Sequence, residues 1–167
     1  MILDIFKRIL NFFLKILFFK RRLPILHYNR HKEEADKLSV CFAITVCDEY
    51  EELRNLLNAI IPYVCENDEI LIQGDEGNIT DKVKEVIAEY NNSISKFVEF
   101  PLNHNFGAYK SQLAKHTKCK YIFQIDADEI PHPYLMRHIH RIIYNNNLDL
   151  IRMARINIMI ENDENFI

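Results

Sequence analysis

Hydrophobic and polar positions follow two different periods along the chain, and the period at each point predicts the local element. Residues 38–46 form a short run rich in β-branched side chains, which is typical of a strand buried on both faces. Apolar residues then recur at helical spacing from Tyr50 until Pro62, which predicts a helix. Further strands are expected at 69–73, 96–100, 121–125 and 148–153. Further helices are expected after the N-cap residue Thr80, over 108–116 and around 135–143.

This order of elements predicts an α/β fold with a mainly parallel, Rossmann-like sheet and helices on both of its faces. In open sheets of this kind, ligands bind at the carboxyl ends of the strands. The three glycines and most of the residues with useful chemistry follow the expected strand ends. These segments are 45–49, 74–77, 103–107 and 126–129. We therefore expect the functional site at this edge of the sheet.

The first 37 residues differ from the rest of the chain, because they hold nine basic and four acidic residues. Residues 1–22 predict an amphipathic, membrane-associating helix with a narrow polar stripe and a basic end. Such a helix suits an anionic membrane surface, although docking on a protein is an open alternative. A spanning helix is less expected, because basic residues interrupt the apolar stretch. Residues 23–37 are interpreted as a linker.

Composition excludes several classes of protein. The net charge of −3 excludes a strongly basic nucleic-acid binder, and the 49% of hydrophobic residues indicates a folded core. The four cysteines form no CxxC pair and are interpreted as reduced thiols in core or loop positions, hence a cytoplasmic protein on the cytosolic face of a membrane. The histidines at 132, 138 and 140 contain no pair at helical i, i+4 spacing and are interpreted as surface residues.

The segment YIFQIDADEIP holds the strongest candidate for chemistry, because an expected strand runs directly into Asp126, Asp128 and Glu129. Residues two apart on an extended segment point the same way, so Asp126 and Asp128 can converge on one site. Paired carboxylates suit Mg²⁺ or Mn²⁺, which bridge protein carboxylates to substrate phosphates. The alternative is an acidic loop at the start of the next helix.

Asp75 lies at another expected strand end, where an acidic residue can accept hydrogen bonds from a ribose or a base. Its alternative role is that of an ordinary turn residue within GDEGN. Neither GxGxxG nor GxxxxGK[ST] occurs, so the usual dinucleotide and P-loop interpretations lose their main support. Cys47 is a poor candidate nucleophile, because neighbouring carboxylates raise the pKa of a thiol.

Four segments together resemble the family 2 glycosyltransferases of the GT-A fold. In chain order they are SVCFAITVCDEYEELRNLLNAI, ILIQGDEGN, NHNFGAYKSQLA and IFQIDADEIP, the last in place of the family's DxD segment. The resemblance covers roughly residues 38–155 and implies a nucleotide-sugar-binding domain over 38–160. Residues 161–167 are then a polar tail.

The resemblance also implies roles for single residues. By position, Thr45, Glu49 and Asp75 correspond to nucleotide contacts, Asp126 to a ribose or metal-side contact, and Asp128 to the metal ligand that holds the sugar diphosphate. The implied reaction is inverting transfer from a nucleoside diphosphate sugar to an unknown acceptor, assisted by Mn²⁺ or Mg²⁺.

The chain departs from the family pattern in two places. Cys47 and Asp48 precede Glu49 where Asn or Arg is common, and the chain ends at Ile167, before the half in which the family carries its acceptor site and general base. The resemblance therefore implies a chain truncated after the DxD region, with its general base unknown. Two alternatives stay open: a non-catalytic module that binds a nucleotide sugar or a partner, and a nucleotidyltransferase. The latter is disfavoured, because no Gly-rich basic loop follows the first strand.

Overall fold

The computed structural model describes residues 35, 37–146, 150–154 and 156. Four strands form one sheet in the order β3-β2-β1-β4, and every neighbouring pair is parallel. The strands are β1 (Val40–Val46), β2 (Glu69–Asp75), β3 (Lys96–Phe100) and β4 (Tyr121–Asp126). The mainly parallel α/β fold predicted from the sequence is confirmed.

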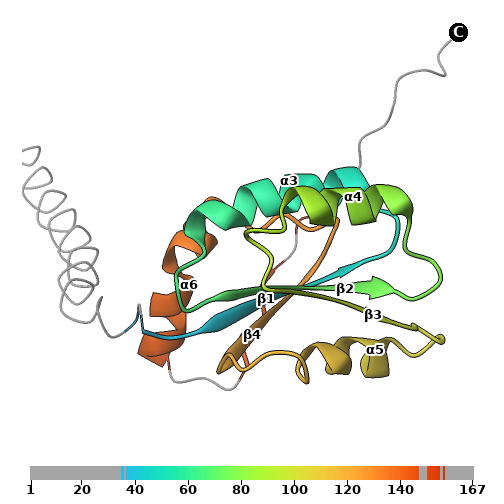
Figure 1. Ribbon diagram of the computed structural model, residues 1–167. Coiled ribbons are helices and arrows are strands. Elements are labelled where there is room, and N and C mark those ends of the chain that lie inside the picture. The colour runs from blue at the N-terminus through green and yellow to red at the C-terminus, as the bar shows by residue number, and fades with distance from the viewer. Residues whose placement is uncertain (1–34, 36, 147–149, 155, 157–167) are drawn as a thin grey trace, which may run out of the picture.

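Helices cover both faces of this sheet (Figure 1). They are α3 (Tyr50–Ile60), the short 3₁₀ helix η1 (Ile61–Tyr63), α4 (Asp81–Glu89), α5 (Phe106–Leu113) and α6 (Pro133–Asn146). The first two long helices, α3 and α4, lie on one face, and α5 lies on the opposite face (Figure 1). Thr80 caps α4 as predicted, because its hydroxyl oxygen accepts a hydrogen bond from the Val83 amide at 3.5 Å.

The central strand β1 is buried on both faces, as its apolar run predicts. Phe42 and Ile44 pack into the larger core, on the side of α3 and α4, whereas Cys41 and Ala43 pack into a smaller cluster that includes Leu113 of α5. All four of these β1 side chains are fully buried. Alternate residues of β1 therefore pack against the helices on the two opposite faces of the sheet.

Two predicted elements differ from the structure. The helix predicted over 108–116 begins at Phe106 and ends at Leu113, because Asn105 provides its N-cap. The strand predicted over 148–153 is wrong in its described part, since residues 150–154 form no strand. Leu150 is 70% exposed, so its apolar character does not reflect burial in the sheet. A short apolar run alone does not determine whether a partner strand is within reach.

Several sequence predictions lie outside the described residues. These are the helix over 1–22, most of the linker over 23–37 and the polar tail over 161–167. Within the part of the chain that the structure describes, no helix has both the length and the apolar character needed to cross a membrane.

Candidate functional site

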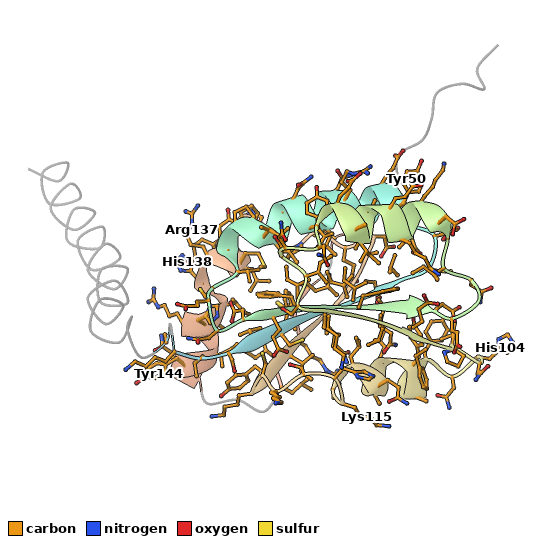
Figure 2. All side chains as sticks on the ribbon, in the orientation of Figure 1. Tyr50, His104, Lys115, Arg137, His138 and Tyr144 are labelled. Carbon is orange, nitrogen blue, oxygen red and sulfur yellow. The ribbon has the colours of Figure 1, made fainter. Side chains whose placement is uncertain are left out.

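The carboxyl ends of all four strands meet at one edge of the sheet, because the strands are parallel. Thr45 of β1 lies opposite Gln73 of β2 and Asp126 of β4 in the strand register. The segments that follow the strands therefore come together there, as the sequence analysis expects. Figure 2 shows His104, between β3 and α5, at this end of the sheet, and Arg137, His138 and Tyr144 of α6 at the other end.

Asp126 is the centre of the strongest polar array at this edge. The hydroxyl of Thr45 donates a hydrogen bond to Asp126 Oδ1 at 2.5 Å. The ammonium group of Lys110, on α5, lies 2.7 Å from Oδ1 and 3.0 Å from Oδ2 of the same carboxylate. The side chains of Lys110 and Asp126 are each about one-third exposed. A hydroxyl, a carboxylate and a cation are thus held together where a ligand can reach them.

Lys110 was not singled out by the sequence analysis. Its spacing within the expected helix carries no chemical signal, and 16 residues separate it from Asp126. The only clue is its position in the segment that resembles the family's Asn-x-Gly helix start. Helix α5 packs on the face of the sheet opposite α3 (Figure 1). From there, the Lys110 ammonium group reaches Asp126 at the end of β4.

Asp126 and Asp128 do not share the extended geometry that the sequence analysis assumed. Asp126 is the last residue of β4, and the chain turns at residues 127–128. The Glu129 amide donates to the Asp126 carbonyl at 2.9 Å, and the Asp126 amide donates to a Glu129 carboxylate oxygen at 3.1 Å. These two hydrogen bonds close the turn, and Asp128 lies exposed within it. The two carboxylates are therefore not aligned by strand alternation as predicted, and their proximity follows from the short turn.

Asp75 is buried, with 8% of its surface exposed, and its carboxylate holds two loops. Oδ1 accepts a hydrogen bond from the Leu102 amide at 2.9 Å, and Oδ2 accepts one from the Asn78 side chain at 2.9 Å. The first bond reaches the β3–α5 loop and the second fixes the β2–α4 loop. Asp75 thus has the structural role of a turn residue, and its nucleotide contact stays a prediction.

Glu49 stabilises the loop between β1 and α3. Its Oε2 atom accepts hydrogen bonds from the amides of Cys47 and Asp48, at 2.8 and 3.2 Å. Burial raises the pKa of the Cys47 thiol, and the nearby carboxylates of Asp48, Glu49 and Asp75 raise it further. The thiol therefore stays protonated near neutral pH, which agrees with its interpretation as a loop residue and not a nucleophile.

The loop before α5 has an unusual backbone. Asn103 and His104 both adopt left-handed conformations, with φ of 46° and 56°. Asn105 follows and caps α5, its side-chain oxygen accepting from the Ala108 amide at 3.0 Å. Residues without glycine's freedom rarely adopt positive φ, and such conformations concentrate at functional sites. Phe106 next to them is 65% exposed.

The oxygen donors at this edge fit a hard divalent cation. Asp128 is exposed and offers a carboxylate of the kind that Mg²⁺ and Mn²⁺ bind. Asp126 is neutralised by Lys110, so it suits a position beside the metal or on a ribose better than the role of main ligand. The residues present therefore fit the predicted cofactor.

One histidine differs from its predicted surface position. His140 is buried, and its Nε2 atom lies 2.9 Å from Asp68 Oδ1. Asp68 immediately precedes β2, at the amino ends of the strands and therefore away from the candidate site. The prediction of a surface residue is wrong for His140, because the apolar face of α6 that packs on the core includes this position.

The chain matches the sequence model of a known protein family. The sequence model of the family described as "Glycosyl transferase family 2" matches residues 41–166, which includes every described strand end. No curated protein matches the chain.

Proposed function

Because the chain belongs to glycosyl transferase family 2, we propose that it transfers a sugar from a nucleoside diphosphate sugar to an acceptor hydroxyl, with inversion at the anomeric carbon. Family membership supports a glycosyltransferase-type function in general. The observation that carries the finer proposal is the array of Thr45, Lys110 and Asp126 beside the exposed Asp128. It provides fixed polar groups and a free carboxylate at the edge where α/β folds bind ligands.

Each residue of the array has a distinct task in this proposal. Thr45 and Lys110 hold the Asp126 carboxylate in one orientation, so that it can accept a hydrogen bond from the donor's ribose or support the metal site. Asp128 would hold the Mg²⁺ or Mn²⁺ ion. When bound, that ion supplies charge neutralisation for the departing diphosphate.

The nucleoside half of the donor is assigned to the neighbouring loops. Asp75 and Glu49 are already oriented by hydrogen bonds to this chain, and each carboxylate oxygen has more than one lone pair to offer a ligand. In the reaction, the acceptor oxygen forms its bond to the anomeric carbon on the face opposite the diphosphate, whose bond breaks. The acceptor proton passes to a general base that we do not assign.

Titration calorimetry tests the donor site. UDP, GDP and their sugars are titrated into the protein with and without Mn²⁺, and we expect metal-dependent binding of one of them. Asp128→Ala removes the proposed metal ligand and is expected to abolish the metal dependence. Glu85→Ala is the matched control, because it removes another exposed carboxylate, on α4 and outside the loops that follow the strands. Unchanged affinity and metal dependence in Asp128→Ala would contradict the assignment.

A non-catalytic binding module is the second candidate. It is favoured by the structural engagement of Asp75 and Glu49, whose carboxylates hold the chain's own loops. An assay for release of the nucleoside diphosphate, with glycan, lipid and protein acceptors, separates the two candidates. Binding without release across all acceptors would favour the module, and release with any acceptor would favour the transferase.

We further propose that residues 1–22 hold the protein on the cytosolic face of an anionic membrane. The support is their basic and apolar composition alone. Co-sedimentation with vesicles containing anionic lipid tests this proposal, with the full chain compared with a variant lacking residues 1–22. We expect only the full chain to sediment, and equal sedimentation would refute the proposal.

A further inference from the structure

A second group of metal-binding side chains lies at the amino ends of the strands, away from the candidate donor site. Among the residues that the structure describes, Cys65, Asp68 and His140 are the group whose sulfur, oxygen and nitrogen ligand atoms all lie within 4.8 Å of one another. Cys65 and Asp68 belong to the loop between η1 and β2, and His140 belongs to α6. Residues 72 positions apart therefore meet at one point.

Asp68 is held rigidly at the centre of this group. Its Oδ1 atom accepts a hydrogen bond from the Val40 amide at 2.9 Å, and its Oδ2 atom accepts one from the Cys65 amide at 2.8 Å. The first bond comes from the start of β1 and the second from the group's own loop. These two hydrogen bonds orient the carboxylate before any ligand arrives. The groups that surround the ligands of a metal site commonly have this role.

The group is buried enough to exclude most water. The side chain of Asp68 is 0% exposed and that of His140 is 9% exposed. A carboxylate in such a place needs a compensating charge or a metal. Cys65 is partly exposed and leaves a route for an ion and for one water ligand.

We propose that Cys65, Asp68 and His140 bind a zinc ion. Zinc is a borderline-soft ion that binds thiolate sulfur, imidazole nitrogen and carboxylate oxygen, and this group offers one ligand of each kind. Bonds of about 2.0 to 2.3 Å in a tetrahedral site put the ligand atoms roughly 3.3 to 3.8 Å apart. A group already within 4.8 Å reaches this geometry through side-chain shifts of about 1 Å.

Binding releases protons and replaces two hydrogen bonds. The Cys65 thiol loses its proton to solvent and gives up its hydrogen bond to the Tyr63 carbonyl. His140 Nε2 gives up the proton that it directs at Asp68, to solvent from a charged ring or to Nδ1 in a neutral ring, and its lone pair then binds zinc. The amides of Val40 and Cys65 keep their bonds to the carboxylate. A water molecule completes the four ligands.

The ion fastens α6 to the start of β2. α6 begins at Pro133, shortly after the Asp126–Glu129 turn, and His140 lies near the middle of this helix, so the zinc site holds the helix that follows the proposed donor metal ligand. The two sites differ in chemistry, because the donor edge offers carboxylate oxygens and this site adds sulfur and nitrogen. The zinc proposal is independent of the proposed transfer reaction.

Cobalt substitution tests the proposal directly. Co²⁺ is titrated into the purified full chain, and a thiolate-to-cobalt charge-transfer band with an endpoint of one equivalent is expected in the near-ultraviolet. Cys65→Ser and His140→Gln are expected to lose the band. Cys119→Ser and His138→Gln are the matched controls, since they alter a second partly buried thiol and a second histidine of α6 and should keep the band.

Two further measurements keep the outcome clear. Asp128→Ala should retain the band, which separates this site from the carboxylates of the donor edge. Zinc should raise the unfolding temperature of the wild type and leave that of Cys65→Ser unchanged.

His140→Gln keeps a side-chain N–H for Asp68, and circular dichroism checks that this variant folds. Absence of the band in the wild type, or an equal band in Cys65→Ser, would show that the group is only a hydrogen-bonded contact between α6 and β2.

Discussion

At the scale of the residue, the carboxylates of the candidate site are held by donors of the chain itself. Asp126 is bound by Thr45 and Lys110, and Asp75 by the Leu102 amide and the Asn78 side chain. Such contacts fix the orientation of each carboxylate in advance, so less conformational entropy is lost when a ligand binds. The same contacts also contribute to stability, so substitutions here act on both properties.

Asp75→Ala is expected to destabilise the fold by about 2 kcal/mol, because it removes two hydrogen bonds from a buried carboxylate and leaves the Leu102 amide without its acceptor. Urea unfolding monitored by circular dichroism measures the loss. Asp75→Asn retains an acceptor oxygen for the Leu102 amide and should lose less. Equal stability of Asp75→Ala and the wild type would exclude the structural role.

Because of Cys41, the free energy of unfolding is expected to fall as the pH rises through the alkaline range. Burial raises the pKa of this thiol to about 11 in the folded state, above its value of about 8.5 in an unfolded chain. The contribution of the protonated Cys41 thiol to the free energy of unfolding is fully present below about pH 8.5. It is lost as the pH rises toward 11, because the thiol ionises in the unfolded state at a lower pH than in the folded state. Urea unfolding between pH 7 and pH 11 should show this fall.

Cys41→Ala is expected to make the alkaline fall in stability shallower. Cys47→Ala is the control, because it leaves the deeply buried thiol of Cys41 in place and should keep the steep fall. If stability fell equally steeply with pH in Cys41→Ala and in the wild type, the alkaline dependence would belong to other groups. Tyr109 is one such group, because burial raises its pKa to about 12.

At the scale of the element, two helices begin at the candidate site with a polar N-cap residue. Asn105 accepts from the Ala108 amide at 3.0 Å at the start of α5, and Thr80 accepts from the Val83 amide at 3.5 Å at the start of α4. The cap of α5 is the shorter bond, and it comes directly after the two left-handed residues of the loop. This cap therefore determines where α5 begins and with it the position of Lys110.

Asn105→Ala is expected to cost about 1 kcal/mol of stability, because the first turn of α5 loses its side-chain acceptor. Thr80→Ala should cost less, given the longer hydrogen bond that it removes. Thermal unfolding of both variants measures the difference. Asn105→Asp preserves the acceptor and should remain near wild-type stability, and a larger loss in Thr80→Ala than in Asn105→Ala would contradict this order.

At the scale of the whole molecule, one main core joins the sheet, α3, α4 and α6. Met136, Ile139 and Ile143 of α6 belong to the same buried cluster as Phe42 of β1 and Leu53 of α3. The helix that follows the Asp126–Glu129 turn is thus anchored through the core as well as through the contact of His140 with Asp68. A change in its packing is expected to affect the whole fold.

Met136→Ala is expected to destabilise the protein by about 2 to 5 kcal/mol, because it leaves a cavity where a fully buried side chain packs. Tyr134→Ala, in the exposed first turn of the same helix, is the control and should change stability by about 0.5 kcal/mol or less. Denaturant unfolding should remain a single transition in both variants. A selective loss of α6 without global unfolding would show that the helix is not part of the common core.

The sequence predicted the parts of the structure that depend on local pattern. Apolar runs and helical spacing identified the four strands and the order of helices between them, because the period of burial is a property of neighbouring residues. The parallel topology then placed Thr45, Asp75 and Asp126 at one edge without any knowledge of contacts. The pattern was misleading at 148–153, because an apolar run does not reveal whether a partner strand is available.

By itself, then, the sequence determined the fold class, the edge at which the candidate residues meet and the resemblance to the family whose model matches the chain. Only the tertiary structure decided that Lys110 meets Asp126, that Asp128 lies in a turn, and that Asp68 and Cys65 meet His140. The physical reason is the range of the interactions. Periodicity records which face of an element is buried, whereas contacts across 16 or 72 residues depend on how the packed elements are positioned in space.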